Sequence, residues 1–349
     1  MMIAHRTNCF VDVKVGNFFI STKNNRKNTL SLFILLKKQY FCSQIGKKKM
    51  NKDNIKNFRD MNGLGVALVT PFKNDGSVDY EALVRLVDYQ IASNTDFLCV
   101  LGTTAETPTL SADEQRKVCE VVIERNAGRL PILLGVGGNC TQAIVDRLSH
   151  DAMEGVDAIL SVVPYYNKPT QAGMLAHFGA IAQATELPVV LYNVPGRTGV
   201  NMLPDTTLRL ANDYANVVAI KEASGNMEQI KAILNQRPDG FKVFSGDDGI
   251  TLPLLKDGAD GVISVIGNAF ASEFAQLVHL AMRGEYAEAE AIDQRLKQMY
   301  ELLFLDGNPA GIKAVLQMRG MMENVLRLPL VPASEATVAK IREFLAAYK

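Results

Sequence analysis

A lysine ends a short apolar run near the middle of the chain. Residues 217–221 read Val-Val-Ala-Ile-Lys, so four apolar residues lead directly to Lys221. Such a run predicts a strand buried on both faces, as in a parallel sheet. An amine that is partly withdrawn from water at the end of this strand is more readily neutral, and a neutral amine can attack a carbonyl carbon to form a Schiff base. The alternative is a lysine whose flexible stem carries its charge out to solvent.

Side chains that suit the same chemistry follow other apolar runs. Thr103 and Thr104 come after one run, a pair of tyrosines ending in Tyr166 comes after another, and Tyr192 closes a third, with Arg197 in the loop beyond it. A tyrosine hydroxyl can transfer a proton, and an arginine can hold a carboxylate through two parallel hydrogen bonds. Taken singly, each feature is also what an ordinary turn or a packed loop would contain.

The elements that carry these residues alternate regularly along the chain. Eight apolar runs, each followed by a helix-like segment, are predicted as strands at residues 65–70, 97–101, 130–135, 158–163, 188–192, 217–221, 241–245 and 261–265. This count predicts the α/β class and a (β/α)8 TIM barrel. In that fold every strand-to-helix junction faces one mouth, so the threonines, Tyr192 and Lys221 would converge with Arg197 nearby. The convergence favours Schiff-base chemistry over a set of unrelated structural residues.

The chain divides into three predicted parts. Residues 1–60 hold 13 Lys or Arg and 3 Asp or Glu, and they show neither helical nor strand periodicity. We expect this basic extension to be disordered or to lie outside the working protein, with a start at Met50 or Met61; a signal peptide, an organelle transit peptide and a basic arm for nucleic acid are the alternatives. Residues 61–284 are predicted as the catalytic barrel, and residues 285–349 as a helical appendage packed on the barrel or on a partner subunit.

Composition excludes several other classes of function. The whole chain holds 37 Lys or Arg and 37 Asp or Glu, so the part after residue 60 is acidic overall. It therefore lacks the excess of basic residues that is typical of proteins that bind nucleic acid. No apolar run approaches the roughly 18 residues needed to span a membrane. Five scattered cysteines without C-x-x-C spacing favour reduced thiols in a cytoplasmic enzyme. Because neither metal-ligand spacing nor a dinucleotide or phosphate-binding glycine motif is present, we expect no metal and no cofactor.

Six motifs between Gly102 and Val265 form a highly specific combination. They are Gly102-Thr103-Thr104-x-Glu106, Pro164-Tyr165-Tyr166-Asn167-x-Pro169, Tyr192-Asn193-Val194-Pro195-x-Arg197-Thr198-Gly199, Ile220-Lys221-Glu222-Ala223, Ser245-Gly246-Asp247-Asp248 and Gly261-Val262-Ile263-Ser264-Val265. With these motifs the chain, from about Gly63 to its C-terminus, resembles the dihydrodipicolinate synthase group of the pyruvate-dependent class I aldolases.

The resemblance implies a condensation reaction that begins with pyruvate. Lys221 would form the Schiff base with pyruvate, and Tyr192 would transfer protons while the imine and the enamine form. Thr103 would link Tyr192 to Tyr166, and Tyr166 would reach in from a neighbouring subunit. The resemblance also implies a homotetramer built from tight dimers.

The remaining implied roles concern substrate binding. Thr104 and Ile263 would contact the bound pyruvate. Arg197 would receive the carboxylate of the second substrate, L-aspartate 4-semialdehyde. The product would be 4-hydroxy-tetrahydrodipicolinate, on the route to diaminopimelate and lysine.

Two other functions remain open at this point. Sister enzymes share the lysine and the tyrosine but act on N-acetylneuraminate or 2-keto-3-deoxy sugar acids; Arg197 and Tyr166 favour the synthase over them. A catalytically silent binding barrel would use the same pocket, although this sequence retains every reactive group.

The chain departs from the family pattern at two places. Ala105 stands where the family usually has glycine, and its Cβ would restrict the turn if that position needed a positive φ. In lysine-inhibited members a feedback site uses an acidic residue whose place falls on Ala143 here, although Asn139 and Tyr165 fit the pattern. We therefore expect weak or absent inhibition by lysine.

Overall fold

The computed structural model describes residues 11–15, 18–22, 58, 61–151 and 153–348. The chain forms two compact units, residues 1–50 and residues 51–349. In the first unit, β1 (Val11–Val15) and β2 (Phe18–Thr22) pair in antiparallel fashion. Two strands therefore lie in the segment for which the sequence pattern indicated no regular element, and the rest of that unit, with Met50, lies outside the described residues.

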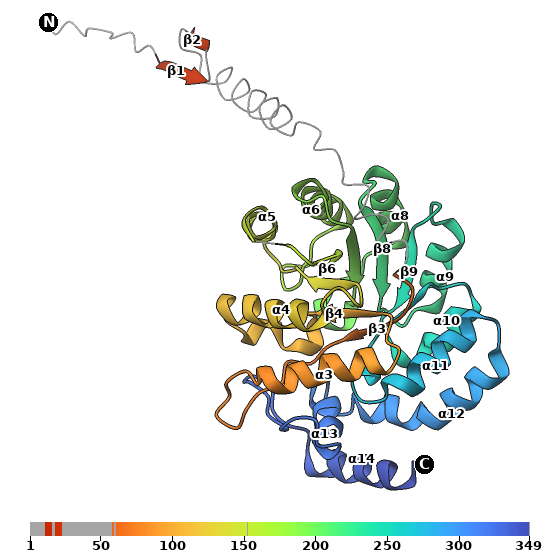
Figure 1. Cartoon of the computed structure of the whole chain (residues 1–349). Coiled ribbons are helices and arrows are strands. Elements are labelled where there is room, and N and C mark those ends of the chain that lie inside the picture. The colour runs from red at the N-terminus through yellow and green to blue at the C-terminus, as the bar shows by residue number, and fades with distance from the viewer. Residues whose placement is uncertain (1–10, 16–17, 23–57, 59–60, 152, 349) are drawn as a thin grey trace, which may run out of the picture. The chain divides into compact units, whose positions relative to one another are not determined.

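Eight parallel strands close the barrel in the described part of the second unit (Figure 1). They are β3 (Gly63–Ala67), β4 (Phe97–Val100), β5 (Ile132–Gly135), β6 (Ala158–Val162), β7 (Val189–Asn193), β8 (Val217–Glu222), β9 (Lys242–Ser245) and β10 (Gly261–Ser264). Each strand pairs with the next, and β10 pairs with β3 to complete the ring. The predicted TIM barrel is confirmed, and each predicted strand overlaps an observed one.

Helices follow the strands and surround the barrel (Figure 1). They are α3 (Tyr80–Ala92), α4 (Ala112–Asn126), α5 (Thr141–His150), α6 (Gln171–Ala184), α8 (Pro204–Asp213), α9 (Met227–Gln236), α10 (Thr251–Lys256) and α11 (Ala271–Met282). The strands are buried on both faces, because one face looks into the barrel and the other meets these helices. A further short helix, α7 (Pro195–Thr198), was not predicted from the sequence and carries Arg197.

The helical appendage consists of α12 (Tyr286–Leu302), α13 (Ala310–Met318) and α14 (Glu335–Ala347). Helix α12 packs against α11, and α14 packs against both α12 and α13, so the appendage continues from the last helix of the barrel. In Figure 1 these helices are blue, and α13 and α14 lie together at one side of the barrel.

The base of the barrel is closed by residues that precede β3, the first strand of the barrel. Phe58 is 2% exposed and belongs to the apolar cluster inside the barrel, together with Met61, Ala219 and Phe244. The ammonium group of Lys242, at the start of β9, donates to the carbonyl oxygens of Phe58 at 3.3 Å and of Met61 at 2.9 Å. The packed unit therefore reaches further towards the N-terminus than the predicted boundary at residue 61.

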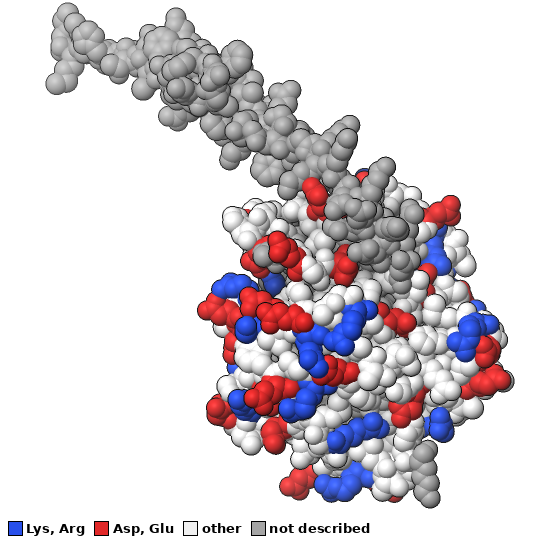
Figure 2. All heavy atoms as spheres, viewed as in Figure 1, with Lys and Arg blue, Asp and Glu red and all other residues white. Residues whose placement is uncertain are grey.

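Within the described residues, no helix combines the length and the apolar character needed to cross a membrane. The same residues contain no group of three or more His, Cys, Asp and Glu side chains that could hold a metal ion. On the face shown in Figure 2, Lys and Arg side chains of the barrel unit are interspersed with Asp and Glu.

Candidate active site

Tyr192 and Lys221 come from neighbouring strands and form the centre of the candidate site. They are partners in the parallel register of β7 and β8. Their side chains are buried, with 6% and 5% exposed, and the Lys221 amine lies 4.6 Å from the centre of the Tyr192 ring. The amine and the proton-transferring group predicted from the sequence are therefore adjacent.

A glycine on the next strand end makes room for the lysine. A Cβ at Gly246 would lie 2.6 Å from Ala223 Cβ and 3.1 Å from Lys221 Cε. Cys99, buried on β4, does not compete as a nucleophile, because burial raises the pKa of its thiol to about 11 and keeps it protonated at neutral pH. Lys221 is thus the nucleophile that the interior of the barrel favours.

The residues that follow the central pair are paired on the opposite face of the sheet. Asn193 and Glu222 are also register partners, and Asn193 Nδ2 donates to Glu222 Oε1 at 2.5 Å. The carboxylate accepts further hydrogen bonds from Gln229 Nε2 at 3.1 Å and from Ser224 Oγ at 2.5 Å. Burial raises the pKa of Glu222, and these hydrogen bonds oppose that rise. The network holds the ends of β7 and β8 in register from outside the barrel.

The ends of β9 and β10 are tied together in a similar way. Asp248 Oδ2 accepts from the backbone N–H groups of Val265 at 3.1 Å and Ile266 at 2.7 Å. Burial raises the pKa of Asp248 to about 6, because few partners compensate for its loss of water. Ile263, on β10, is fully buried and shares the interior cluster with Tyr192.

The turn after β4 presents the two threonines. Thr103 and Thr104 lie in a 3₁₀ turn, Thr103–Ala105, and Thr104 is buried whereas Thr103 lines a cavity. Ala105 does not have a positive φ; the left-handed residue of this turn is Glu106, at φ 54°. The substitution of the usual glycine by Ala105 therefore does not strain the turn.

A cavity of about 630 Å³ lies over the ends of β5, β6 and β7 and the turn after β4. Thr103, Tyr192 and Arg197 line it, so the structure brings these predicted site residues to one space. Arg197 lies on α7 and is an exposed residue, and its Nη2 donates to the carbonyl oxygen of Asn308 at 3.3 Å.

Asn308 is a site residue that the sequence analysis missed. It comes from the segment before α13, lines the cavity and is 6% exposed. Its Nδ2 donates to Thr104 Oγ1 at 2.9 Å, and its carbonyl oxygen accepts from Arg197. One residue of the appendage therefore connects two predicted substrate-binding residues, across sequence separations that no local pattern reveals.

Four predicted site residues are absent from the described lining of the cavity. Lys221, Thr104 and Ile263 are buried. Tyr166, by contrast, is directed to solvent in the single chain. Its side chain is 84% exposed, its φ is 75°, and it is not among the described residues that line the cavity. The preceding Tyr165 does line the cavity, as do Pro329 and Leu330.

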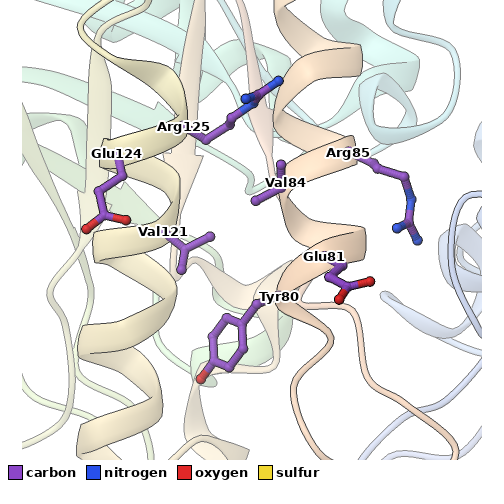
Figure 3. Close-up of a pocket in the computed structure, with 7 residues that line it drawn as sticks. All are labelled: Tyr80, Glu81, Val84, Arg85, Val121, Glu124 and Arg125. Atoms are coloured by element: carbon purple, nitrogen blue, oxygen red, sulfur yellow. The ribbon is translucent and has the colours of Figure 1, made fainter.

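A second hollow lies on the outside of the barrel, between α3 and α4 (Figure 3). Its side chains come from both helices, as Figure 3 shows, and include Tyr80, Arg85 and Arg125. Arg125 is held by Asp88 through two contacts of 2.6 Å. This hollow contains none of the residues predicted to do chemistry, so the cavity at the strand ends is the candidate site.

Comparison with known proteins agrees with the geometry. The model of the Dihydrodipicolinate synthetase family matches residues 60–348. The chain belongs to this family. The 4-hydroxy-tetrahydrodipicolinate synthase of Phocaeicola vulgatus is 60% identical over 285 residues, which cover 82% of this chain and 96% of that relative.

Solved structures of the dihydrodipicolinate synthetase family are similar in fold. The crystal structure of dihydrodipicolinate synthase from Aquifex aeolicus has a TM-score of 0.80 and 42% identity, covering 82% of this chain and 98% of that one. The structure from Cyanidioschyzon merolae with lysine bound has a TM-score of 0.79 and 39% identity, covering 82% and 98%. The family, the fold and the enzyme class predicted from the sequence are confirmed, and the predicted synthase activity is the one that the Phocaeicola relative is named for.

Proposed function

We propose that the chain is a 4-hydroxy-tetrahydrodipicolinate synthase in which Lys221 forms a Schiff base with pyruvate. The observation that carries the proposal is the pairing of Lys221 with Tyr192, which lines the cavity together with Thr103 and Arg197. The Lys221 amine attacks the keto carbon of pyruvate, and the carbinolamine loses water to give an iminium. Loss of a methyl proton then gives the enamine, and Tyr192 carries the protons of these steps.

The second half of the reaction forms the carbon–carbon bond. The enamine attacks the aldehyde of L-aspartate 4-semialdehyde, whose carboxylate is held by the Arg197 guanidinium on the cavity wall. The amine of that substrate then closes on the former keto carbon and displaces Lys221, which releases cyclic 4-hydroxy-tetrahydrodipicolinate for diaminopimelate and lysine biosynthesis. Thr104 and Ile263 hold the pyruvate unit during both halves.

The site is completed by a second copy of the chain, which supplies Tyr166 to the relay through Thr103. Support comes from Tyr166, which is 84% exposed in the single chain. Leu328 is 80% exposed and directly precedes Pro329 and Leu330, which line the cavity. An exposed apolar side chain beside the cavity is what a partner subunit would cover. The assembly is a homotetramer of tight dimers working in the cytoplasm.

A coupled assay tests this function. Purified protein is given pyruvate and L-aspartate 4-semialdehyde together with the NADPH-dependent reductase that consumes the product. We expect turnover in the wild type and in Lys256→Ala, a surface control, and none in Lys221→Ala. Borohydride in the presence of pyruvate should add the mass of a reduced pyruvate unit to the wild type only at Lys221. Turnover by folded Lys221→Ala, or none by the folded wild type, would contradict the proposal, and trapping without turnover would indicate a sister aldolase, to be tested with N-acetylneuraminate.

A further inference from the structure

The helical appendage reaches the catalytic turn through a buried ion pair. Lys313 Nζ, on α13, lies 2.5 Å from Glu106 Oε1, and both side chains are fully buried. Moving two opposite charges out of water is costly, so the pair requires good geometry and further hydrogen bonds. Lys313 Nζ also donates to the carbonyl oxygen of Val325 at 2.9 Å.

Phe72 packs against the cations of the appendage. The centre of its fully buried ring is 4.2 Å from Lys313 Nζ and 4.6 Å from Arg327 Cζ, so both cations meet an aromatic ring. Burial lowers the pKa of Lys313 to about 8, and Glu106 opposes this shift, so the amine remains protonated at neutral pH. Lys313 therefore meets Glu106 as a cation at neutral pH.

Glu106 lies between two 3₁₀ turns, the first of which carries the threonines. Its φ of 54° is uncommon for a residue other than glycine and persists only where the surroundings enforce it. Its N–H donates to the carbonyl oxygen of Thr103 at 3.1 Å, and its own carbonyl accepts from Thr109 N at 2.8 Å. The two 3₁₀ turns on either side of Glu106 thus meet at a residue whose side chain is anchored in the appendage.

Arg327 supplies a second anchor to the same turn. Its backbone N–H donates to Glu106 Oε2 at 3.0 Å, and its guanidinium forks onto the Glu114 carboxylate at 2.8 and 2.6 Å. Each carboxylate oxygen of Glu106 is therefore held by a different residue of the appendage, one by Lys313 and one by Arg327.

We propose that Lys313 is a positioning residue for the reaction, because its ion pair with Glu106 holds the turn that places Thr103 and Thr104 at the cavity. This inference rests on the proposed function, since the pair acts on turnover only through those threonines. The Lys313 side chain is fully buried, and its amine is occupied by Glu106 and by the carbonyl oxygen of Val325, so we expect it to act through Glu106 and not on the substrate. The appendage is then a working part of the active site.

Two single variants and their combination test the pair. Lys313→Met leaves Glu106 buried without its cation, and Glu106→Gln leaves Lys313 without its anion; we expect each to lower kcat roughly tenfold and to raise the KM for pyruvate about fivefold, as the threonines shift. Arg197, which receives L-aspartate 4-semialdehyde, lies on α7 and not on this turn. The KM for that substrate should therefore change less than about twofold. The double variant removes both charges and should regain most of the lost kcat, because neither charge is then left unpaired.

A matched control separates positioning from general stability. Lys242 is also a buried lysine, at the opposite end of the barrel, and Lys242→Met should lower the melting temperature while leaving the KM for pyruvate unchanged. The inference is overturned if Lys313→Met behaves like Lys242→Met, or if the losses of the two single variants simply add in the double variant. If Lys313→Met does not fold, Glu106→Gln and the double variant decide by the same readouts. Absence of turnover and of pyruvate trapping in the wild type would instead refute the proposed function.

Discussion

The Lys221 amine lies 4.6 Å from the centre of the ring of Tyr192, its register partner on the neighbouring strand. The next pair along the same two strands, Asn193 and Glu222, is hydrogen-bonded on the outer face of the sheet. Because side chains alternate between the faces of a strand, a slip of β8 by one residue would turn its side chains to the opposite faces and break both pairs. The outer hydrogen bond therefore helps to hold the reacting pair in place.

Removing the hydroxyl of Tyr192 should slow the reaction without preventing pyruvate from binding. We expect Tyr192→Phe to lower kcat about 100-fold, because a positioned proton donor and acceptor is lost while the ring against Lys221 remains. Pyruvate trapping by borohydride should still occur, but more slowly. Tyr286→Phe, at an exposed tyrosine of α12, serves as the control. A Tyr192→Phe rate within twofold of the wild type would remove Tyr192 from the proton-transfer steps.

Gly246 should be intolerant of even a methyl group. A Cβ there would lie 2.6 Å from Ala223 Cβ and 3.1 Å from Lys221 Cε, so the strand end beside the lysine must shift. We expect Gly246→Ala to lower kcat/KM for pyruvate by roughly 10- to 100-fold. Gly249→Ala is the matched control from the same loop, since its Cβ would meet nothing closer than 3.5 Å. Equal activity in the two variants would show that the lysine can adjust.

Phe58 should contribute to stability but not to chemistry. Phe58→Ala would leave a cavity in the apolar cluster inside the barrel, at a cost of about 3–5 kcal/mol of unfolding free energy. Chemical denaturation measures this cost, and the kcat of the folded variant should stay near that of the wild type. Phe304→Ala, at a side chain that is 43% exposed, should cost about 1 kcal/mol or less. A similar small cost for Phe58→Ala would mean that the base of the barrel does not depend on this segment.

The barrel could be predicted because its signal is local. Each strand is a short apolar run that ends at a turn, and the count of these runs alone selects the closed sheet. The same reasoning placed Lys221, Tyr192 and Thr103 at one end, because topology fixes the direction of every strand. Strand ends were less well placed, as at β3, which begins two residues before the prediction.

Contacts between distant segments could not be predicted in this way. Asn308 reaches Thr104 across 204 residues, and no spacing rule connects an asparagine before α13 with a turn after β4. The sequence left open whether Ala105 needs a positive φ, and in the structure the positive φ falls on Glu106 instead. The buried carboxylate of Glu106 is held there by Lys313 and by the backbone N–H of Arg327, and neither pairing is visible in the sequence.

Mixing two inactive variants should restore activity if Tyr166 acts across subunits. Lys221→Ala lacks the nucleophile, and Tyr166→Phe lacks the relay hydroxyl but should still trap pyruvate. In a mixed dimer, the site with an intact Lys221 receives Tyr166 from its partner. Random exchange of subunits should give roughly a quarter of wild-type turnover, because half of the dimers are mixed and each has one intact site of two.

The separate variants and a direct measurement of mixed dimers provide the controls for subunit exchange. The separate variants, assayed at the same total concentration, should remain inactive. If Tyr166→Phe alone turns over at the wild-type rate, the hydroxyl has no part in the relay. If the mixture stays inactive although mass spectrometry of the intact dimers detects mixed dimers, Tyr166 acts within its own chain, in spite of its exposure.

Inhibition by lysine should be weak, because among the described residues that line the cavity no carboxylate is free to bind its ammonium groups. Ala143 stands where lysine-inhibited members of the family carry an acid, and Glu106, which lines the cavity, is engaged by Lys313. Arg147 also lines the cavity, as a cation paired with Asp151 at 3.1 Å, and so offers an ammonium group no attraction. We expect millimolar L-lysine to leave wild-type turnover nearly unchanged, although the fold can accept this ligand, as in the Cyanidioschyzon merolae structure. Ala143→Glu should bring inhibition into the sub-millimolar range, whereas the neutral Ala143→Gln should not, and sub-millimolar inhibition of the wild type would show that another group replaces the missing acid.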